Sequence, residues 1–202
     1  MKLIQRINSS QHIGEIGNYL DTLTSHECLQ EIQTLRKSHQ KKLYDLAQLS
    51  KPLSLDHFAS KKPLQEVIHD GRNSLPIFSL FQKRFCRAND ESNRIFGYNQ
   101  GPTTKWIGPG YFVAKTTVNH PEWSKRGSIV IDYYEVPDGD VVSSWPTIVP
   151  NSVGVQQLVY HQMRDFMRRV SDTVSVGVAY QKGKNLNQYF VLCKKTSASN
   201  QS

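Results

Sequence analysis

An aspartate interrupts a run of β-branched and aromatic residues that extends over residues 128–136. Alternation along a strand places Asp132 on one face together with Val130 and Tyr134. Strands are poor in aspartate, so we interpret this carboxylate as a general base or as a group that orients a ligand. The alternative is a structural role, either an ion pair with a nearby arginine or lysine or exposure on an open face of the sheet.

A histidine and two arginines at helical spacing form the second group with chemical potential. His161, Arg164 and Arg168 fall on one side of a predicted helix, opposite its apolar stripe. An imidazole side chain titrates at about pH 6.5 and can act as an acid or a base, so Asp132 and His161 are the candidate catalytic residues. The guanidinium groups would instead hold a phosphate or carboxylate through bidentate hydrogen bonds. A helix face in contact with solvent would carry the same residues.

A segment rich in glycine, proline and aromatic residues extends over residues 96–112. Glycine and proline permit tight turns, and the aromatic side chains supply flat surfaces with polar edges. We interpret the segment as a binding loop at the mouth of a pocket, because loops of this kind commonly carry function. The alternative is a turn between two strands whose aromatic side chains fill the core. The candidate ligand-binding residues are Tyr98, Asn99, Lys105, Trp106, Tyr111, Tyr134, Arg164 and Arg168.

The signature motifs of several enzyme classes are missing. The sequence has no GxSxG elbow, HExxH, Walker A, GxGxxG, EF-hand loop or paired CxxC. We therefore expect neither a P-loop nucleotide hydrolase nor a dinucleotide-dependent Rossmann enzyme. His161 and Asp165 offer two ligands where zinc needs three or four, so no metal site is predicted. No cofactor is identified by the residues, and whether the protein is an enzyme stays open.

The chain is basic, with 25 lysines and arginines against 17 aspartates and glutamates and a formal net charge of +8. Such an excess favours an anionic partner. The excess is spread evenly, since residues 1–101 carry 14 basic and 10 acidic side chains and residues 102–202 carry 11 and 7. The alternative partner is therefore a nucleic acid or another anionic macromolecule, bound through Lys83, Arg84, Arg87, Arg164 and Arg168.

Three cysteines, Cys28, Cys86 and Cys193, lie far apart in the sequence. An odd and sparse set argues for reduced thiols, so we expect a cytoplasmic protein. The first residues lack the apolar core of a secretory signal, and no apolar run approaches the ~20 residues that a membrane-spanning helix needs. Export without an N-terminal signal and the oligomeric state stay open.

The N-terminal part is predicted to be helical. Residues 13–23 carry apolar side chains at helical spacing, and Thr24 with Glu27 matches a capping box at the start of a second helix that continues to Leu49. A short third helix is predicted over residues 63–69, with a proline at its start and Asp-Gly directly after it.

Residues 74–87 fit either a helix or a strand. We favour a helix, because strand alternation would place Ser79 and Lys83 on the apolar face. Beyond Arg94, short β-branched and aromatic runs predict strands over residues 94–98, 111–118, 128–136, 174–180 and 188–194. A hairpin loop over residues 181–187 joins the last two.

An amphipathic helix is predicted over residues 152–171. Its apolar stripe comprises Val155, Leu158, Val159, Met163, Phe166, Met167 and Val170. Packing of this stripe on a sheet would leave the row of His161, Arg164 and Arg168 on the opposite side.

Together these elements predict an α+β fold, in which an N-terminal helical segment accompanies a mostly antiparallel sheet of about five strands covered by one amphipathic helix. The expected organisation is a helical segment over residues 1–72, an α+β domain over residues 73–195 and a disordered tail over residues 196–202. The expected function is a pocket between sheet and helices for an anionic or aromatic small molecule. Binding of an anionic macromolecule, or of a protein partner through the N-terminal helices, is the alternative.

Overall fold

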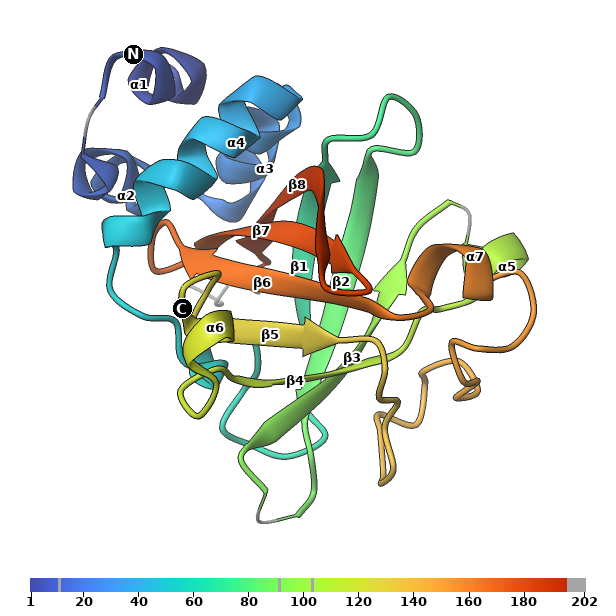
Figure 1. Cartoon of the computed structure of the whole chain (residues 1–202). Coiled ribbons are helices and arrows are strands. Elements are labelled where there is room, and N and C mark those ends of the chain that lie inside the picture. The colour runs from blue at the N-terminus through green and yellow to red at the C-terminus, as the bar shows by residue number, and fades with distance from the viewer. Residues whose placement is uncertain (11, 91, 103, 196–202) are drawn as a thin grey trace.

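Eight strands form a closed antiparallel barrel in the computed structural model, which describes residues 1–10, 12–90, 92–102 and 104–195. Each strand pairs with the next along the chain, and the last pairs with the first (Figure 1). The strands are β1 (Val67–Asn73), β2 (Leu80–Arg87), β3 (Arg94–Gln100), β4 (Phe112–Thr116), β5 (Ile129–Asp132), β6 (Met163–Arg169), β7 (Val174–Gln181) and β8 (Lys184–Lys194). The predicted α+β fold, with an open five-stranded sheet under one helix, is therefore wrong.

Four helices form a layer outside the barrel. They are α1 (Leu3–Ser9), α2 (Ile13–Asp21), α3 (Ser25–Gln33) and α4 (Lys37–Leu46). In this layer α3 and α4 contact β1, β7 and β8, and α1 packs on the other helices. The predicted capping box is confirmed, since the Thr24 hydroxyl accepts from the Glu27 amide and the Glu27 carboxylate accepts from the Thr24 amide at 2.8 Å. The second predicted helix is interrupted, because α3 ends at Gln33 and α4 begins three residues after Thr34.

Short helical turns complete the fold among the described residues. They are α5 (Thr104–Ile107), α6 (Pro121–Ser124), α7 (Gln157–Tyr160) and the 3-10 turns η1 (Ala47–Leu49) and η2 (Leu55–His57). No helix of the described part is long and apolar enough to cross a bilayer.

Side chains alternate between the barrel interior and its outer surface. On β5, Ile129 and Ile131 join the interior cluster, whereas Val130 packs outward under the helices. Inward glycines make room for large rings: a Cβ on Gly97 would lie 2.4 Å from the Phe112 ring, and one on Gly177 would lie 2.3 Å from the Phe190 ring. Small and large inward residues thus fit together to fill the middle of the barrel.

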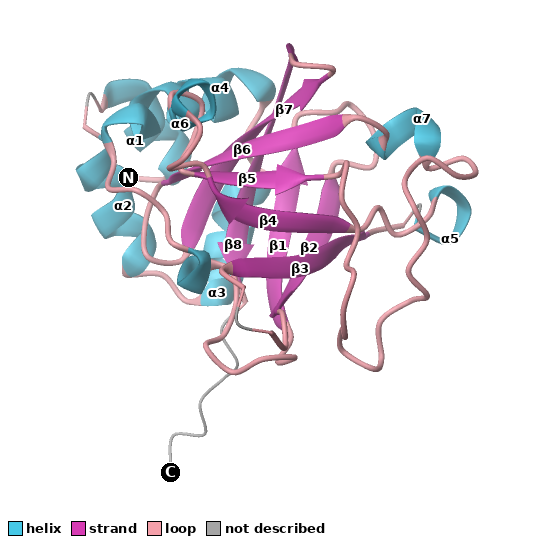
Figure 2. Cartoon of the chain, turned by 60° about the horizontal axis from the view of Figure 1, so that its bottom comes forward, coloured by secondary structure: helices cyan, strands magenta, loops and turns pink. Residues whose placement is uncertain are grey.

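The two ends of the barrel differ. At one end, here called the closed end, Leu53, Leu55 and Phe58 pack into the interior cluster and plug the barrel. The other end, here called the mouth, is framed by the connections over residues 74–79, 101–102, 104–111, 150–162 and 182–183. Figure 2 shows α5 and α7 at the mouth, away from the four N-terminal helices.

The predicted helix over residues 152–171 is wrong, because the structure has the short α7 followed by strand β6. Phe166 is fully buried but faces outward under the helical layer, and Met167 faces inward. Since both faces of β6 carry apolar residues, alternation is hidden and the run resembles a helix stripe.

The predicted helices over residues 63–69 and 74–87 are also wrong, because β1 begins at Val67 within the first range and β2 takes residues 80–87 of the second. Lys83, whose inward position argued against a strand, lies inside the barrel with 2% of its surface exposed. The five predicted strands are present as β3, β4, β5, β7 and β8, but the last hairpin is tighter than predicted. Lys182 and Gly183, both at positive φ, form its turn, so β8 begins at Lys184. The predicted disordered tail over residues 196–202 lies outside the described residues.

Candidate binding site inside the barrel

A cavity of about 410 Å³ opens at the mouth and reaches into the barrel. Its walls are mostly apolar and include Phe81, Tyr160, Met163, Ala179 and Phe190. Four polar side chains also line it: Lys83, Asn99, Tyr133 and Asp165. An apolar cavity with a few converging polar groups is the usual form of a small-molecule site.

The four polar side chains form one hydrogen-bonded network. Lys83 Nζ donates to Asn99 Oδ1 at 2.9 Å and to the Tyr133 hydroxyl at 2.5 Å, and it lies 3.2 Å from Asp165 Oδ2. The Tyr133 hydroxyl also contacts Asp165 Oδ2 at 3.2 Å. Asn99 Nδ2 donates to the Gly110 carbonyl at 3.2 Å, which fixes the orientation of the amide. Because β2, β3 and β6 each supply one member and Tyr133 directly follows β5, closure of the barrel assembles the network.

Burial governs the electrostatics of this network. It lowers the pKa of Lys83 and raises the pKa of Asp165, and each shift is opposed by the charge of the partner. Burial and the nearby Asp165 raise the pKa of Tyr133 well above its usual value, which keeps the phenol protonated. Aromatic rings surround the ammonium, with the Phe112 centroid at 5.0 Å and the Phe190 centroid at 5.2 Å. Polar contacts made here by a guest are strengthened by the low local dielectric.

The network leaves one strong acceptor for a guest. All three ammonium donors of Lys83 face an acceptor, and Asn99 Nδ2 has Gly110 and Tyr133 as partners. Asp165 Oδ1, by contrast, has no hydrogen-bond partner among the described residues, although its carboxylate lines the cavity. A guest with an N–H or O–H group can therefore bind this oxygen without breaking the network.

The predicted catalytic aspartate, Asp132, faces outward from the barrel interior and is buried there. Asp132 Oδ2 accepts from Arg164 Nε at 2.9 Å, and its Oδ1 accepts from the Tyr134 amide at 3.0 Å. The Arg164 guanidinium stacks on the rings of Tyr134 at 4.1 Å and Trp123 at 4.6 Å. This is the geometry of the ion-pair alternative, and it does not bring Asp132 or Arg164 to the cavity.

The other predicted ligand-binding residues are dispersed. Tyr98 and Tyr111 are buried on the outer wall, where they pack with Trp145. Arg168 donates to the carbonyls of Tyr44 and Lys125, both at 2.9 Å, which ties β6 to neighbouring segments.

Three further candidates lie at the mouth. Lys105 and Trp106 are on α5, and Trp106 is 83% exposed. His161 follows α7, and its carbonyl accepts from Gln181 Nε2 at 3.2 Å. Asn99 is the only predicted site residue that belongs to the cavity network.

Sequence reasoning missed Lys83, Tyr133 and Asp165 as members of one site. A signal was present in each case, namely a polar residue at an inward position of an alternating apolar run. Lys83 stands between Phe81 and Phe85, and Asp165 stands between Met163 and Met167. The signal was not usable for Asp165, because residues 152–171 were predicted to be a helix.

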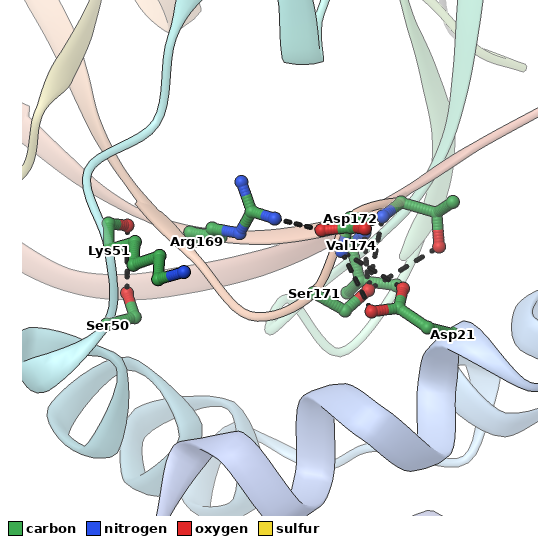
Figure 3. Close-up of polar contacts among 8 residues, drawn as sticks. Asp21, Ser50, Lys51, Arg169, Ser171, Asp172 and Val174 are labelled. Carbon is green, nitrogen blue, oxygen red and sulfur yellow. Dashed lines mark hydrogen bonds and ion pairs between the residues drawn. The ribbon is translucent and has the colours of Figure 1, made fainter.

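A second hollow of about 280 Å³ lies on the outer surface between η1 and β6 and is lined in part by Lys51 and Arg169. Figure 3 shows that Arg169 pairs with Asp172 in the β6–β7 turn, and that the Asp172 amide donates to the Asp21 carboxylate at 3.0 Å. The Val174 amide donates to Ser171 Oγ at 3.1 Å in the same turn. These contacts fasten α2 to the barrel, so we assign this region a structural role.

The cations of the nucleic-acid hypothesis are engaged within the protein. Lys83 is inside the barrel, Arg84 pairs with Glu66 at 3.3 Å, and Arg87 pairs with Asp56 at 2.5 Å. No three His, Cys, Asp or Glu side chains of the described residues gather closely enough to hold a metal ion. Comparison with protein-family models, with curated proteins and with solved structures gave no match to this chain.

Proposed function

We propose that the barrel binds a small, largely apolar molecule in its interior, with a hydrogen-bonding group of that molecule on the Lys83–Asp165 network. The observation that carries this proposal is the cavity of about 410 Å³, which is open at one end and is lined in part by a buried polar network. Small closed barrels have room for one such guest in their interior. The apolar walls supply affinity, and the network supplies orientation.

The guest is expected to be uncharged. The charges of Lys83 and Asp165 compensate each other at 3.2 Å, so a charged group placed beside them would be desolvated without a counter-ion of its own. The free acceptor at Asp165 Oδ1 favours a guest with an alcohol, amide or amine N–H donor. Binding is favoured over catalysis, because the one amine in the cavity already has acceptors for all of its protons.

The environment-sensitive dye N-phenyl-1-naphthylamine tests this proposal, since it is neutral, apolar and carries one N–H donor. We expect a saturable rise in its fluorescence with one site per chain. Ala179 lines the cavity, so Ala179→Trp should fill the space and abolish the rise. Val118, which is 75% exposed in the β4–β5 connection away from the mouth, provides the matched control, and Val118→Trp should bind the dye as the unaltered protein does.

Retention of dye binding by a folded Ala179→Trp variant would contradict the proposal. Circular dichroism and a cooperative thermal transition establish whether that variant is folded. If Ala179→Trp does not fold, Met163→Trp places the same ring in the same cavity from β6 and must abolish dye binding in its turn.

A further inference from the structure

Large apolar side chains are exposed around the mouth of the barrel. They come from three connections that are distant in sequence, with Leu75, Ile77 and Phe78 before β2, Trp106 on α5 and Leu158 on α7. We call these five residues the apolar rim. Trp106 is 83% exposed and Leu158 is 82% exposed. Exposed apolar residues gathered in this way mark a contact surface, whereas scattered ones need no explanation.

The three connections belong to the same opening. Leu75, Ile77 and Phe78 line the cavity mouth from one side, and Ile107 and Val159, neighbours of Trp106 and Leu158, line it from the other. Figures 1 and 2 both place α5 and α7 next to each other at this end, opposite the helical layer. The rim residues therefore lie at or directly beside the entrance to the cavity.

The charge around the rim has one sign. The segments over residues 74–79, 101–111, 150–162 and 182–183 contain no aspartate or glutamate, but they contain Lys105 and Lys182, and Lys184 follows directly. The β5–β6 connection carries three acidic residues before residue 150, of which Glu135 pairs with Lys115 and Asp138 pairs with Arg94, and the third is the exposed Asp140. An anionic surface that approaches the mouth therefore meets lysines and no carboxylate from these segments.

We propose that the apolar rim docks on the surface of an anionic lipid bilayer, with the mouth of the barrel facing the lipid. Tryptophan beside lysine is the residue pair that the membrane–water interface favours, because the indole ring lies at the headgroup level and the lysine chain extends to the phosphates. Lys105 and Trp106 are adjacent on α5. Separate apolar loop tips around an opening fit a deformable surface better than the complementary relief of a protein partner.

Intrinsic fluorescence and vesicle flotation test this docking. Trp106 is the exposed indole, whereas Trp145 is buried and Trp123 is packed against His120 and Arg164. We expect a blue shift of tryptophan emission and co-flotation with phosphatidylcholine vesicles that contain phosphatidylserine. Vesicles of phosphatidylcholine alone should bind more weakly, and added salt should weaken binding to the anionic vesicles.

Matched substitutions localise the contact. Trp106→Ser and Leu158→Ser should each weaken binding about tenfold or more, since each removes a large apolar side chain from the interface. Lys105→Gln and Lys182→Gln should each weaken it about fivefold. Leu49 and Val118 are 85% and 75% exposed away from the rim, so Leu49→Ser and Val118→Ser should bind as the unaltered protein does. None of these side chains is buried, so the variants should fold.

Absence of flotation with anionic vesicles would overturn the proposal, and so would an equal loss in the rim and control variants. Self-association that Trp106→Ser abolishes, without vesicle binding, would assign the rim to a second copy of this chain and would also overturn it. The dye assay for the cavity is carried out without vesicles. Failure of docking and failure of interior binding are thus distinguishable.

Discussion

Removal of the buried ammonium is the sharpest test of the barrel interior. Lys83→Met leaves the Asp165 carboxylate, which is 4% exposed, without its cation. Breaking a buried ion pair by removing one partner costs about 3 to 5 kcal/mol of unfolding free energy. This loss of unfolding free energy should be larger at high pH than at low pH. In the variant, burial without a cation raises the pKa of Asp165 further, so the folded state takes up a proton that the unfolded state does not.

The sign of the pH dependence follows from this uptake. A carboxyl group with a raised pKa in the folded state stabilises that state at low pH, and the benefit is lost as pH rises through the folded pKa. The unfolding free energy of Lys83→Met should therefore fall further below that of the unaltered protein at pH 8 than at pH 5. Urea unfolding followed by circular dichroism at both pH values measures the difference.

The double variant separates the ion pair from the guest site. Lys83→Met with Asp165→Leu leaves no unpaired charge, so its stability should return to within about 2 kcal/mol of the unaltered protein. Dye binding should change even though the fold is restored. As a control, Arg84→Met breaks the partly exposed pair with Glu66, and it should cost no more than about 1 kcal/mol. The reasoning is refuted if Lys83→Met costs less than this control, or if the double variant is less stable than both single variants.

Three further predictions concern the rest of the protein. Phe166→Ala should cost about 3 to 5 kcal/mol in urea unfolding, because Phe166 is fully buried between barrel and helices, whereas Val155→Ala should change stability by less than about 0.5 kcal/mol. Burial lowers the pKa of His57 to about 3 and that of the neighbouring His69 well below its usual value. Stability should therefore fall as pH drops below about 6.5, by up to roughly 1.4 kcal/mol per pH unit for each histidine, and His57→Leu should remove its share of this dependence. All three cysteines are buried and free, so an aromatic disulfide reagent should label them slowly in the native protein and at once in guanidinium.

Local patterns predicted the strands that have one partly polar face or clear turn residues at their ends. They failed for β1, β2 and β6, and at β6 the cause is that both faces of the strand are covered. Residues 174–178 were recognised because β-branched residues dominate them, but β6 contains methionine, phenylalanine and arginine, which helices accept equally. The helical layer causes the ambiguity, because it buries the outer face of β6 as well as the inner one.

Closure of the barrel had no local signal. Pairing of β1 with β8 places Asp70 opposite Cys193, and no turn chemistry links segments so far apart. The hydrogen-bonded network also depends on barrel closure, because Lys83 and Asp165 are 82 positions apart in the sequence (165 − 83). The sequence indicated that Lys83 would be a misplaced charge in a strand. Only the closed barrel supplies the carboxylate that makes the position favourable.

The two strand aspartates show how strand register decides which side of the barrel wall a carboxylate faces. In the β5–β6 pair, Asp132 stands opposite Arg164, and Asp165 stands opposite Ile131. Each strand therefore directs one aspartate to a different side of the same wall, Asp132 outward to an arginine and Asp165 inward to Lys83. The inward pair is neutral as a unit, whereas the mouth carries unopposed lysines. Under the two proposals, an anionic surface would be attracted to the entrance while the interior would favour an uncharged guest, so different parts of the barrel would select the two partners.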